Sequence, residues 1–385
     1  MPDPGPPLSR SARRFDEFLR SRGLEGRVVE LPESTRTATD AARAVGCELR
    51  SIVKSLIFRV GDDGPPVLVL VSGANRIDEA RLAPFVGGPI SRADPEFVRS
   101  VTGYAIGGVP PAALAGPMAA FVDYALLELP EIWAAAGTPR AVFRLTPLEL
   151  LRLSGARAVP IAPQGPRPDG AGEWITFDCF GTLVDWRTGI VSSLAQLGIG
   201  RSAVERQRVL AGYLELESAV ESGTYRSYRE VMTETLVRAA RRAGLGVTED
   251  RASQLAESIP TWPVFPDTVT ALRALRDGGR RLGILSNIDR DLLDRTVAAH
   301  DLPIERSVTA EEVRSYKPAP AHWIRFMQAT GARSADVRHV SASYEFDLET
   351  ANALGFRTVF VDRYGPPPAG RPVGEVVRTL GALSA

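Results

Sequence analysis

Cysteine is scarce in this 385-residue chain, and the two cysteines, Cys47 and Cys179, lie far apart in the sequence. The spacing excludes a disulfide framework and a zinc-binding pattern, so we expect a reducing compartment. The chain also has no apolar run near the ~18 residues of a membrane-spanning helix, and its proline-rich N-terminus lacks the apolar segment of a secretory signal. These absences together predict a cytoplasmic protein with no membrane partner.

Net charge is absent as well, because 46 lysine and arginine residues balance 46 aspartate and glutamate residues. The protein is therefore not a basic nucleic-acid binder by bulk charge, and any RNA contact would need a local patch. Lysine itself is nearly missing, since Lys54 and Lys317 are the only two. Lysine is a compact point charge and arginine a wide planar fork, so these positions are candidates for sites that need a small cation.

The composition that remains is that of a globular protein, with 44% hydrophobic and 24% charged residues, and the length suffices for two domains. Residues 161–172 are rich in proline and glycine and have no periodic apolar pattern, which predicts a linker. We therefore expect one domain over residues 1–160 and a second over residues 173–385.

The first half has the pattern of a mixed α+β domain. Apolar residues at helical spacing predict helices over 11–22 and 37–45. Runs rich in valine, isoleucine and leucine predict paired strands over 52–60 and 66–72, and a short strand over 120–123.

The second half alternates strands with helical patterns, which is typical of parallel βαβ units and of an α/β fold. A long helical stretch, about residues 190–264, follows the first strand. The predicted strands are 174–177, 281–285, 306–308, 337–340 and 358–361. In such sheets the reacting groups gather at the carboxyl ends of the strands.

Polar side chains stand at those strand ends. Asp178 follows the first strand, and a carboxylate there can attack carbon or phosphorus to form an ester that water later cleaves. Lys317 would lower the pKa of such a carboxylate and balance the developing charge. The other candidates can donate hydrogen bonds or carry a second negative charge: Thr182, Ser286, Asn287, Ser343 and Asp347.

Four segments, FDCFGTLVDW, LGILSN, SYKPAP and HVSAS, in this order closely resemble the haloacid dehalogenase superfamily over about residues 173–363. The resemblance implies that the helical stretch 190–264 is a cap that covers the site and selects a small-molecule substrate. It also implies the following roles: Asp178 as nucleophile, Thr182 and Ser286 as substrate-binding residues, Lys317 as charge-balancing cation and Asp347 as part of the last acidic motif.

Two departures indicate the subclass. Phosphatases of this superfamily have an acid/base aspartate where this chain has Phe180, and a further aspartate where it has Ala342. Magnesium needs hard oxygen ligands, so neither a metal nor another cofactor is expected, and a phosphatase is the alternative. FDCFGTLVDW resembles instead the metal-independent 2-haloacid dehalogenase branch. That branch holds the substrate carboxylate with an arginine early in the cap, for which three candidates stay open: Arg208, Arg226 and Arg229.

In the first half, Lys54 lies inside an otherwise apolar strand, so its ammonium either reaches a sheet edge or faces a polar pocket. The pair Gly107-Gly108 allows a ligand close to the backbone and can present N–H groups to it. The segments STRTATDAARAVG, IVKSLIF, LVSGANRID, TGYAIGGVPP and VDYALLEL closely resemble the YbaK / prolyl-tRNA-synthetase editing-domain family over about residues 9–162.

This second resemblance implies hydrolysis of a mischarged aminoacyl-tRNA, with the aminoacylated 3′ end of tRNA as partner. Lys54 would bind near the terminal adenosine or its phosphate, Gly107 and Gly108 would line the pocket, and Asp123 would contact the substrate. No side-chain nucleophile is needed, because an aminoacyl ester is already activated.

The two halves together predict a bifunctional hydrolase: an aminoacyl-tRNA deacylase fused to a metal-independent hydrolase with an aspartate nucleophile. In one alternative only one half is catalytic, and the other is a binding module for tRNA or a small molecule, or a scaffold that supports a homodimer. Fold does not decide among these readings, which depend on the sites.

Overall fold

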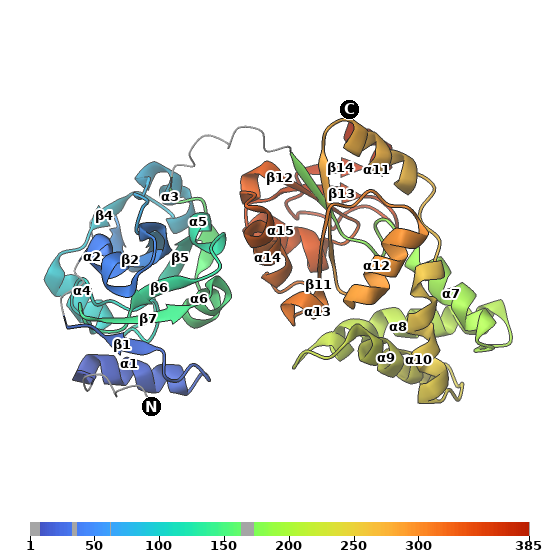
Figure 1. The fold of residues 1–385 in the computed structure, drawn as a ribbon, viewed down its shortest axis with the longest axis horizontal. Helices are drawn as coiled ribbons and strands as arrows, with labels where there is room; N and C mark the ends of the chain where they lie inside the picture. The colour runs from blue at the N-terminus through green and yellow to red at the C-terminus, as the bar shows by residue number, and fades with distance from the viewer. Residues whose placement is uncertain (1–7, 33–36, 62, 163–172, 385) are drawn as a thin grey trace. The chain divides into compact units, whose positions relative to one another are not determined.

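The computed structural model describes residues 8–32, 37–61, 63–162 and 173–384. The chain forms two compact units that divide between Arg167 and Pro168, called here the N-terminal and the C-terminal unit (Figure 1). The predicted linker 161–172 lies outside the described residues, apart from Ile161 and Ala162. No helix in the described ranges is both long and apolar enough to span a membrane.

The N-terminal unit is built on a mixed sheet with the strand order β1-β7-β6-β2-β3-β5-β8, and β4 pairs with β2. The strands are β1 (Val28–Glu30), β2 (Ile52–Val60), β3 (Pro66–Ser72), β4 (Ile90–Arg92), β5 (Ala119–Asp123), β6 (Ile132–Ala135), β7 (Ala141–Leu145) and β8 (Arg157–Val159). The helices are α1 (Arg10–Arg20), α2 (Ala38–Val45), α3 (Glu79–Val86), α4 (Pro95–Thr102), α5 (Tyr124–Leu127) and α6 (Pro147–Ser154), with a 3₁₀ turn at Leu49–Ser51.

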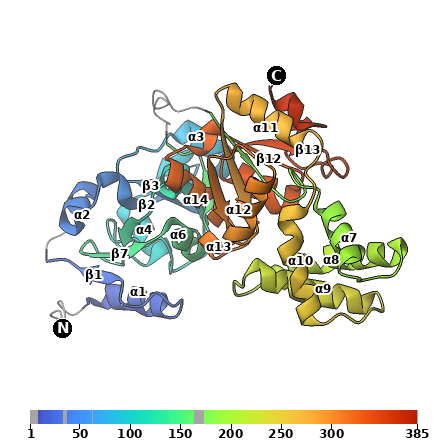
Figure 2. The same ribbon diagram turned by 45° about the vertical axis from the view of Figure 1, so that its right-hand side comes forward.

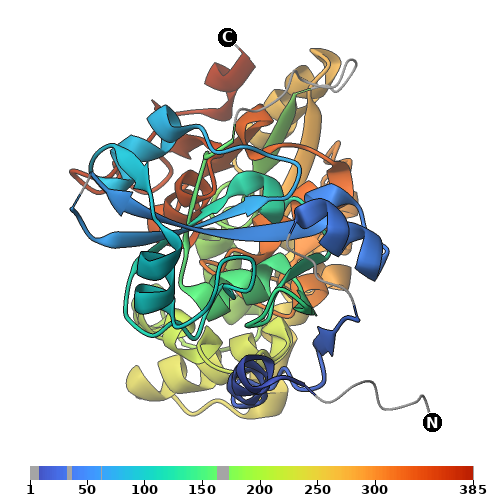
Figure 3. The ribbon, with the colours of Figure 1, turned by 90° about the vertical axis from the view of Figure 1, so that its left-hand side faces the viewer.

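The central hairpin of this sheet confirms the two predicted strands at their predicted bounds. β2 and β3 pair antiparallel from Val53 opposite Ser72 to Arg59 opposite Pro66, and Figure 3 shows β2 as a long blue strand across the unit. Their β-branched and leucine side chains suit a pleated surface that is covered by helices. Every residue of β3 after Pro66 is buried, so the hairpin forms the middle of the core.

The C-terminal unit is an α/β domain whose sheet is parallel throughout, in the order β11-β10-β9-β12-β13-β14. The strands are β9 (Trp174–Phe177), β10 (Arg281–Ser286), β11 (Arg306–Thr309), β12 (Val337–Ser341), β13 (Arg357–Val361) and β14 (Glu375–Val377). The first five confirm the predicted strands, while the exposed β14 was not predicted. The helices that follow the insertion are α11 (Thr268–Asp277), α12 (Arg290–Ala299), α13 (Ala310–Val313), α14 (Ala321–Thr330) and α15 (Glu349–Ala353).

Four helices are inserted between β9 and β10 and gather at one end of the unit (Figures 1 and 2). They are α7 (Trp186–Gln196), α8 (Ala203–Glu221), α9 (Tyr228–Arg242) and α10 (Glu249–Ser258), and a 3₁₀ turn at Ile259–Thr261 follows. Ser202 and Ser227 begin α8 and α9 with capping boxes, in which the serine and the third helical residue, a glutamate, satisfy backbone N–H groups reciprocally. We call these four helices the helical insertion.

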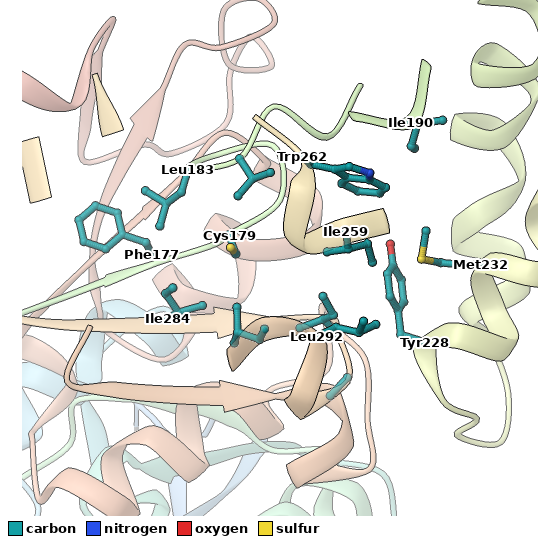
Figure 4. Close-up of a cluster of buried hydrophobic side chains, with 14 of the residues drawn as sticks. Phe177, Cys179, Leu183, Ile190, Tyr228, Met232, Ile259, Trp262, Ile284 and Leu292 are labelled. Carbon is teal, nitrogen blue, oxygen red and sulfur yellow. The ribbon is translucent and has the colours of Figure 1, made fainter. Parts of the chain in front are cut away.

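One hydrophobic core joins the sheet to the helical insertion. Phe177 and Ile284, from adjacent strands, belong to the same buried cluster as Ile190 and Met232 from the insertion (Figure 4). Trp262 packs so closely on α7 that a Cβ at Gly189 would lie 2.3 Å from its ring, so only glycine fits there. The insertion is therefore fixed to the sheet by packing, and the carboxyl ends of the strands face a defined wall.

Candidate active sites

The central feature of the C-terminal unit is a cluster of two carboxylates and one ammonium at the carboxyl ends of adjacent strands. Asp178 follows β9, Asp347 follows β12, and Lys317 lies in the loop before α14. Lys317 Nζ donates to Asp178 Oδ1 at 2.8 Å and to Asp347 Oδ1 at 2.7 Å. Its third N–H donates to the carbonyl oxygen of Leu285 at 3.0 Å, so all three donors of the ammonium are used.

Burial sets the electrostatics of this cluster. Burial alone would lower the pKa of Lys317, but Asp178 and Asp347 outweigh it and raise that pKa above its ordinary value. Burial would raise the pKa of Asp347, but Lys317 and His339 outweigh it and lower that pKa. The pKa of Asp178 is raised, because burial exceeds the stabilisation that Lys317 and Thr182 provide. At neutral pH the ammonium and the Asp347 carboxylate are therefore both charged.

Thr182 and Asn287 fix the geometry of the cluster. Thr182 Oγ1 donates to Asp178 Oδ2 at 2.9 Å and accepts from the Ala342 N–H at 3.0 Å. Asn287 Oδ1 accepts from the Lys317 N–H at 2.7 Å, and its amide donates to the Lys317 carbonyl at 3.2 Å. Asn287 therefore positions the loop that carries the ammonium, while Thr182 orients one oxygen of Asp178.

The two predicted serines lie at the same site with different contacts. Ser286 ends β10 and lines the cavity above Asp178. Ser343 also lines the cavity, but its Oγ accepts from the Phe346 N–H at 3.3 Å and so begins the turn that carries Asp347. The structure thus brings together all seven residues predicted for this half.

The structure adds a histidine that the sequence did not single out. His339 Nε2 lies 3.0 Å from Asp347 Oδ1, and its Nδ1 lies 2.9 Å from Thr176 Oγ1. His339 is fully buried in β12, within the segment HVSAS. A buried histidine on a strand usually only packs, so nothing in the sequence distinguished this one.

A cavity of about 490 Å³ opens above Asp178. Its wall from the helical insertion includes Glu217 and Glu221 of α8 and Arg187 of α7. None of the three arginines left open by the sequence lines it. Arg226 pairs with Glu234, Arg229 pairs with Glu257, Asp289 and Asp291, and Arg208 is exposed.

A magnesium ion does not fit the residues at this site. The positions that would supply extra carboxylates carry Phe180 and Ala342, whose side chains have no oxygen. Asp178 and Asp347 share the ammonium of Lys317. Three more carboxylates also line the cavity: Glu217, Glu221 and Glu345. Within the described ranges, no three His, Cys, Asp or Glu side chains come close enough to hold a metal ion.

The N-terminal unit has its own cavity, of about 830 Å³, lined by Lys54, Arg76 and Gly107 among other residues. Lys54 Nζ donates to the carbonyl oxygens of Gly73, at 3.3 Å, and Asn75, at 2.5 Å. Both partners are neutral, and the third N–H of the ammonium has no partner among the described residues. Burial, and then the nearby Arg76, lower the pKa of Lys54. Lys54 thus faces a polar pocket, one of the two alternatives that the sequence allowed.

Gly107 and Gly108 have different roles in this unit. Gly107 has φ +83°, a left-handed conformation that favours glycine, and it lines the cavity. Gly108 does not line the cavity, and its N–H donates to the Ala105 carbonyl at 3.0 Å, so this amide is not presented to a ligand. A Cβ at Gly108 would lie 2.7 Å from the Thr138 backbone, so this glycine permits close packing.

Asp123 also lies outside the cavity lining. Its Oδ1 accepts from the N–H groups of Ile161 and Ala162, at 2.9 and 3.0 Å. Its Oδ2 accepts from the Asn75 side chain at 3.2 Å. Asp123 is buried, and it reaches the site only through Asn75, whose carbonyl oxygen accepts from Lys54.

Comparison with known proteins assigns a relative to each unit. Residues 32–153 match the family model of the aminoacyl-tRNA editing domain, and residues 173–355 match that of the haloacid dehalogenase-like hydrolases. Haloacetate dehalogenase H-2 of Moraxella sp. (strain B) is 30% identical over 50% of this chain and 87% of the relative. The uncharacterized protein YwhH of Bacillus subtilis (strain 168) is 32% identical over 34% of this chain and 82% of the relative.

A crystal structure of a candidate trans-editing enzyme for prolyl tRNA synthetase is 52% identical, over 41% of this chain and 100% of that chain, with a TM-score of 0.39. Folds, sites and matches together define the chain as a two-unit α/β hydrolase. It belongs to the aminoacyl-tRNA editing domain family in its N-terminal unit and to the haloacid dehalogenase-like hydrolases in its C-terminal unit.

Proposed function

We propose that the chain is a bifunctional hydrolase, in which the C-terminal unit displaces a leaving group from carbon and the N-terminal unit deacylates mischarged tRNA. The observation that carries the first part is the Asp178–Lys317–Asp347 cluster, at a site whose positions 180 and 342 carry no oxygen ligand. The second part is supported by Lys54, which lines a cavity of the editing-domain unit and has two hydrogen-bond partners for its three N–H groups among the described residues.

In the C-terminal unit, an oxygen of Asp178 forms a bond to the substrate carbon while the bond from that carbon to the halogen breaks. The halide leaves with the electron pair, and Lys317 offsets the change of charge at Asp178. Water then attacks the carbonyl carbon of the ester, which restores Asp178 and releases the hydroxylated product and a proton. Asp347, held ionised by Lys317 and His339, can orient that water.

The same residues support a reaction without a metal ion. The leaving halide needs no proton, so the acid/base side chain that Phe180 replaces is not required. Lys317 supplies the positive charge that a metal ion would supply elsewhere. For the carboxylate of a 2-haloacid, Arg187 is the arginine that lines the cavity, in place of the three candidates considered from the sequence.

The test is chloride release from 2-chloropropionate, measured with and without a chelator. We expect release that survives chelation and disappears in Asp178→Asn, while Asp277→Asn, at the exposed end of α11, serves as the matched control. Release of phosphate from common phosphate esters, dependent on Asp178, would instead support the phosphatase alternative and contradict this proposal.

For the N-terminal unit, the test is deacylation of a panel of mischarged tRNAs. We expect the intact protein to clear at least one aminoacyl-tRNA, and Lys54→Ala to abolish that activity. Arg43→Ala, which removes an exposed cation from α2, is the control for a general loss of positive charge. If Lys54→Ala deacylates as well as the intact protein, the assignment of this site is wrong.

The alternative in which only one unit is catalytic is tested with the same variants. Asp178→Asn should leave deacylation intact, and Lys54→Ala should leave chloride release intact. A unit that shows no activity with either panel is a binding module or a scaffold.

A further inference from the structure

The cavity of the C-terminal unit has an acidic wall that the proposed reaction does not use. Glu217 and Glu221 lie four residues apart on α8, on the same face of the helix, and both line the cavity above Asp178. Tyr228 Oη donates to Glu217 Oε1 at 2.7 Å. Neither glutamate forms an ion pair with a lysine or arginine of the described ranges.

Burial destabilises the ionised form of a carboxylate when no cation lies beside it. Burial raises the pKa of Glu217 to about 7, and burial together with Glu217 raises the pKa of Glu221 to about 9. Lys317 offsets this rise only in part at Glu221, whose pKa stays raised, and its three N–H groups already bond Asp178, Asp347 and the Leu285 carbonyl. Burial therefore favours the neutral form of both side chains, and a cationic group of a ligand in the cavity would favour their ionised forms.

The same cavity offers a place for a negative group on another element. Arg187 of α7 lies with its guanidinium 3.8 Å from the ring centroid of Tyr364. Its Nε is buried and has no hydrogen-bond partner among the described residues. A guanidinium that is positioned by an aromatic ring and forms no ion pair among the described residues suits a carboxylate.

We propose that the substrate of the C-terminal unit is an α-amino acid with a leaving group on its side chain. Glu217 and Glu221 bind the ammonium, Arg187 binds the carboxylate, and Asp178 faces the carbon that carries the leaving group. This inference rests on the proposed nucleophilic role of Asp178 for the reaction, but not for the binding. A simple 2-haloacid has only the negative group and would leave the acidic wall unsatisfied.

The reaction balances with 3-chloroalanine as the probe. An Asp178 oxygen bonds to the β-carbon, the C–Cl bond breaks, and chloride leaves with its electron pair. Water cleaves the resulting ester, so the products are serine, chloride and one proton.

Binding is tested first, with ligands that cannot react. Alanine and propionate differ only in the ammonium group, and isothermal titration calorimetry compares their affinities for the intact protein. We expect alanine to bind about tenfold or more tightly, as a charged hydrogen bond contributes ~1.5–3 kcal/mol. If propionate binds as tightly as alanine, or if neither binds, the proposal is overturned.

The acidic wall is tested by isosteric substitutions. The double variant Glu217→Gln with Glu221→Gln should lose most of the preference for alanine over propionate. Glu215→Gln is the matched control, since Glu215 is an exposed residue of the same helix that pairs with Arg242. An unchanged preference in the double variant, with a thermal melting curve like that of the intact protein, contradicts the assignment.

Turnover separates this inference from the proposed function. Chloride release from 3-chloroalanine should exceed that from 3-chloropropionate, which has the same carbon chain without the ammonium. Equal release from both, abolished in Asp178→Asn, would overturn the amino-acid substrate and keep the nucleophile. A preference for alanine in binding with no chloride release would keep the substrate class and overturn the chemistry.

Discussion

The two lysines of the chain occupy sites that differ in nearly every physical respect. Lys317 is buried between two carboxylates and a carbonyl, and its pKa is raised. Lys54 is half-buried, bonds two neutral carbonyl oxygens, and has a lowered pKa. In the C-terminal unit the lysine ammonium uses all three N–H groups and balances two carboxylates. In the N-terminal unit it uses two N–H groups among the described residues.

The difference between the two lysines corresponds to the different roles proposed for them. A reacting carboxylate needs a fixed positive charge beside it throughout the reaction, and a fully bonded ammonium provides this without movement. A pocket that receives a ligand needs a cation whose hydration has been partly removed and whose donors are not all used. Partial burial disfavours the charged form of such a cation, and hydrogen bonds to a bound ligand can offset this loss of hydration.

The largest effect is expected from Lys317→Met, which removes the ammonium whose three N–H groups are all hydrogen-bonded. Removing the ammonium leaves the buried Asp178 and Asp347 without their shared cation, with hydrogen bonds among the described residues only to Thr182 and His339, so the free energy of unfolding should fall by about 3–5 kcal/mol. Chemical denaturation of the full chain, followed by a probe in the C-terminal unit, measures this. A loss of less than ~1 kcal/mol would show that the carboxylates are not held as the structure places them.

A smaller effect on stability, with a larger one on activity, is expected from Lys54→Met. The variant loses two hydrogen bonds to neutral carbonyls, so the free energy of unfolding should fall by only about 1–2 kcal/mol. Deacylation should nevertheless be lost, because the donor that faces the cavity is gone. The paired measurement is denaturation and deacylation of the same preparation; parallel losses in both would indicate a structural role for Lys54.

The fold of the C-terminal unit could largely be predicted because β9, β10 and β13 contain short apolar runs that stop at a polar residue, and the predicted strands alternate with helical patterns. β14 escaped because two of its three residues are exposed and it has no such pattern. In the N-terminal unit, β6 and β7 were not predicted. β6 is the four-residue segment IWAA, half alanine, and β7 is the five-residue segment AVFRL, which lacks a strict alternation of apolar and polar residues; the two strands pair with each other in the sheet.

The cluster around Asp178 could be predicted because parallel strands bring their carboxyl ends to one edge. Which side of α8 faces the cavity could not be predicted from the sequence. The sequence YLELESAVESG is visibly acidic, but only the packing of α8 shows that Glu217 and Glu221 face the cavity while Glu215 faces solvent. Likewise, only the structure shows that the Gly108 amide is already bonded to Ala105.

Lys54 and Lys317 should also differ in their reactivity toward acylating reagents. Only a neutral amine reacts with an acylating reagent, so the lowered pKa of Lys54 should make it reactive below the ordinary lysine pKa of 10.5. Lys317, whose pKa is raised and whose donors are all used, should stay unmodified in the folded protein. Mass spectrometry of the two lysine peptides after acetic anhydride treatment over a pH series measures both. Comparable labelling of the two at any pH would contradict the contrast.

The smallest effect is expected from Arg76→Gln, which separates the two causes of the lowered Lys54 pKa. Burial is the larger cause and Arg76 the smaller, so the substitution should move the pKa back only part of the way toward 10.5. At a fixed pH below that value, more Lys54 is then protonated and its acylation slows. Arg43→Gln, an exposed cation on α2, should leave the rate unchanged. An acylation rate that Arg76→Gln does not slow would assign the lowered pKa to burial alone, and the cavity would then act on Lys54 through desolvation rather than through a second cation.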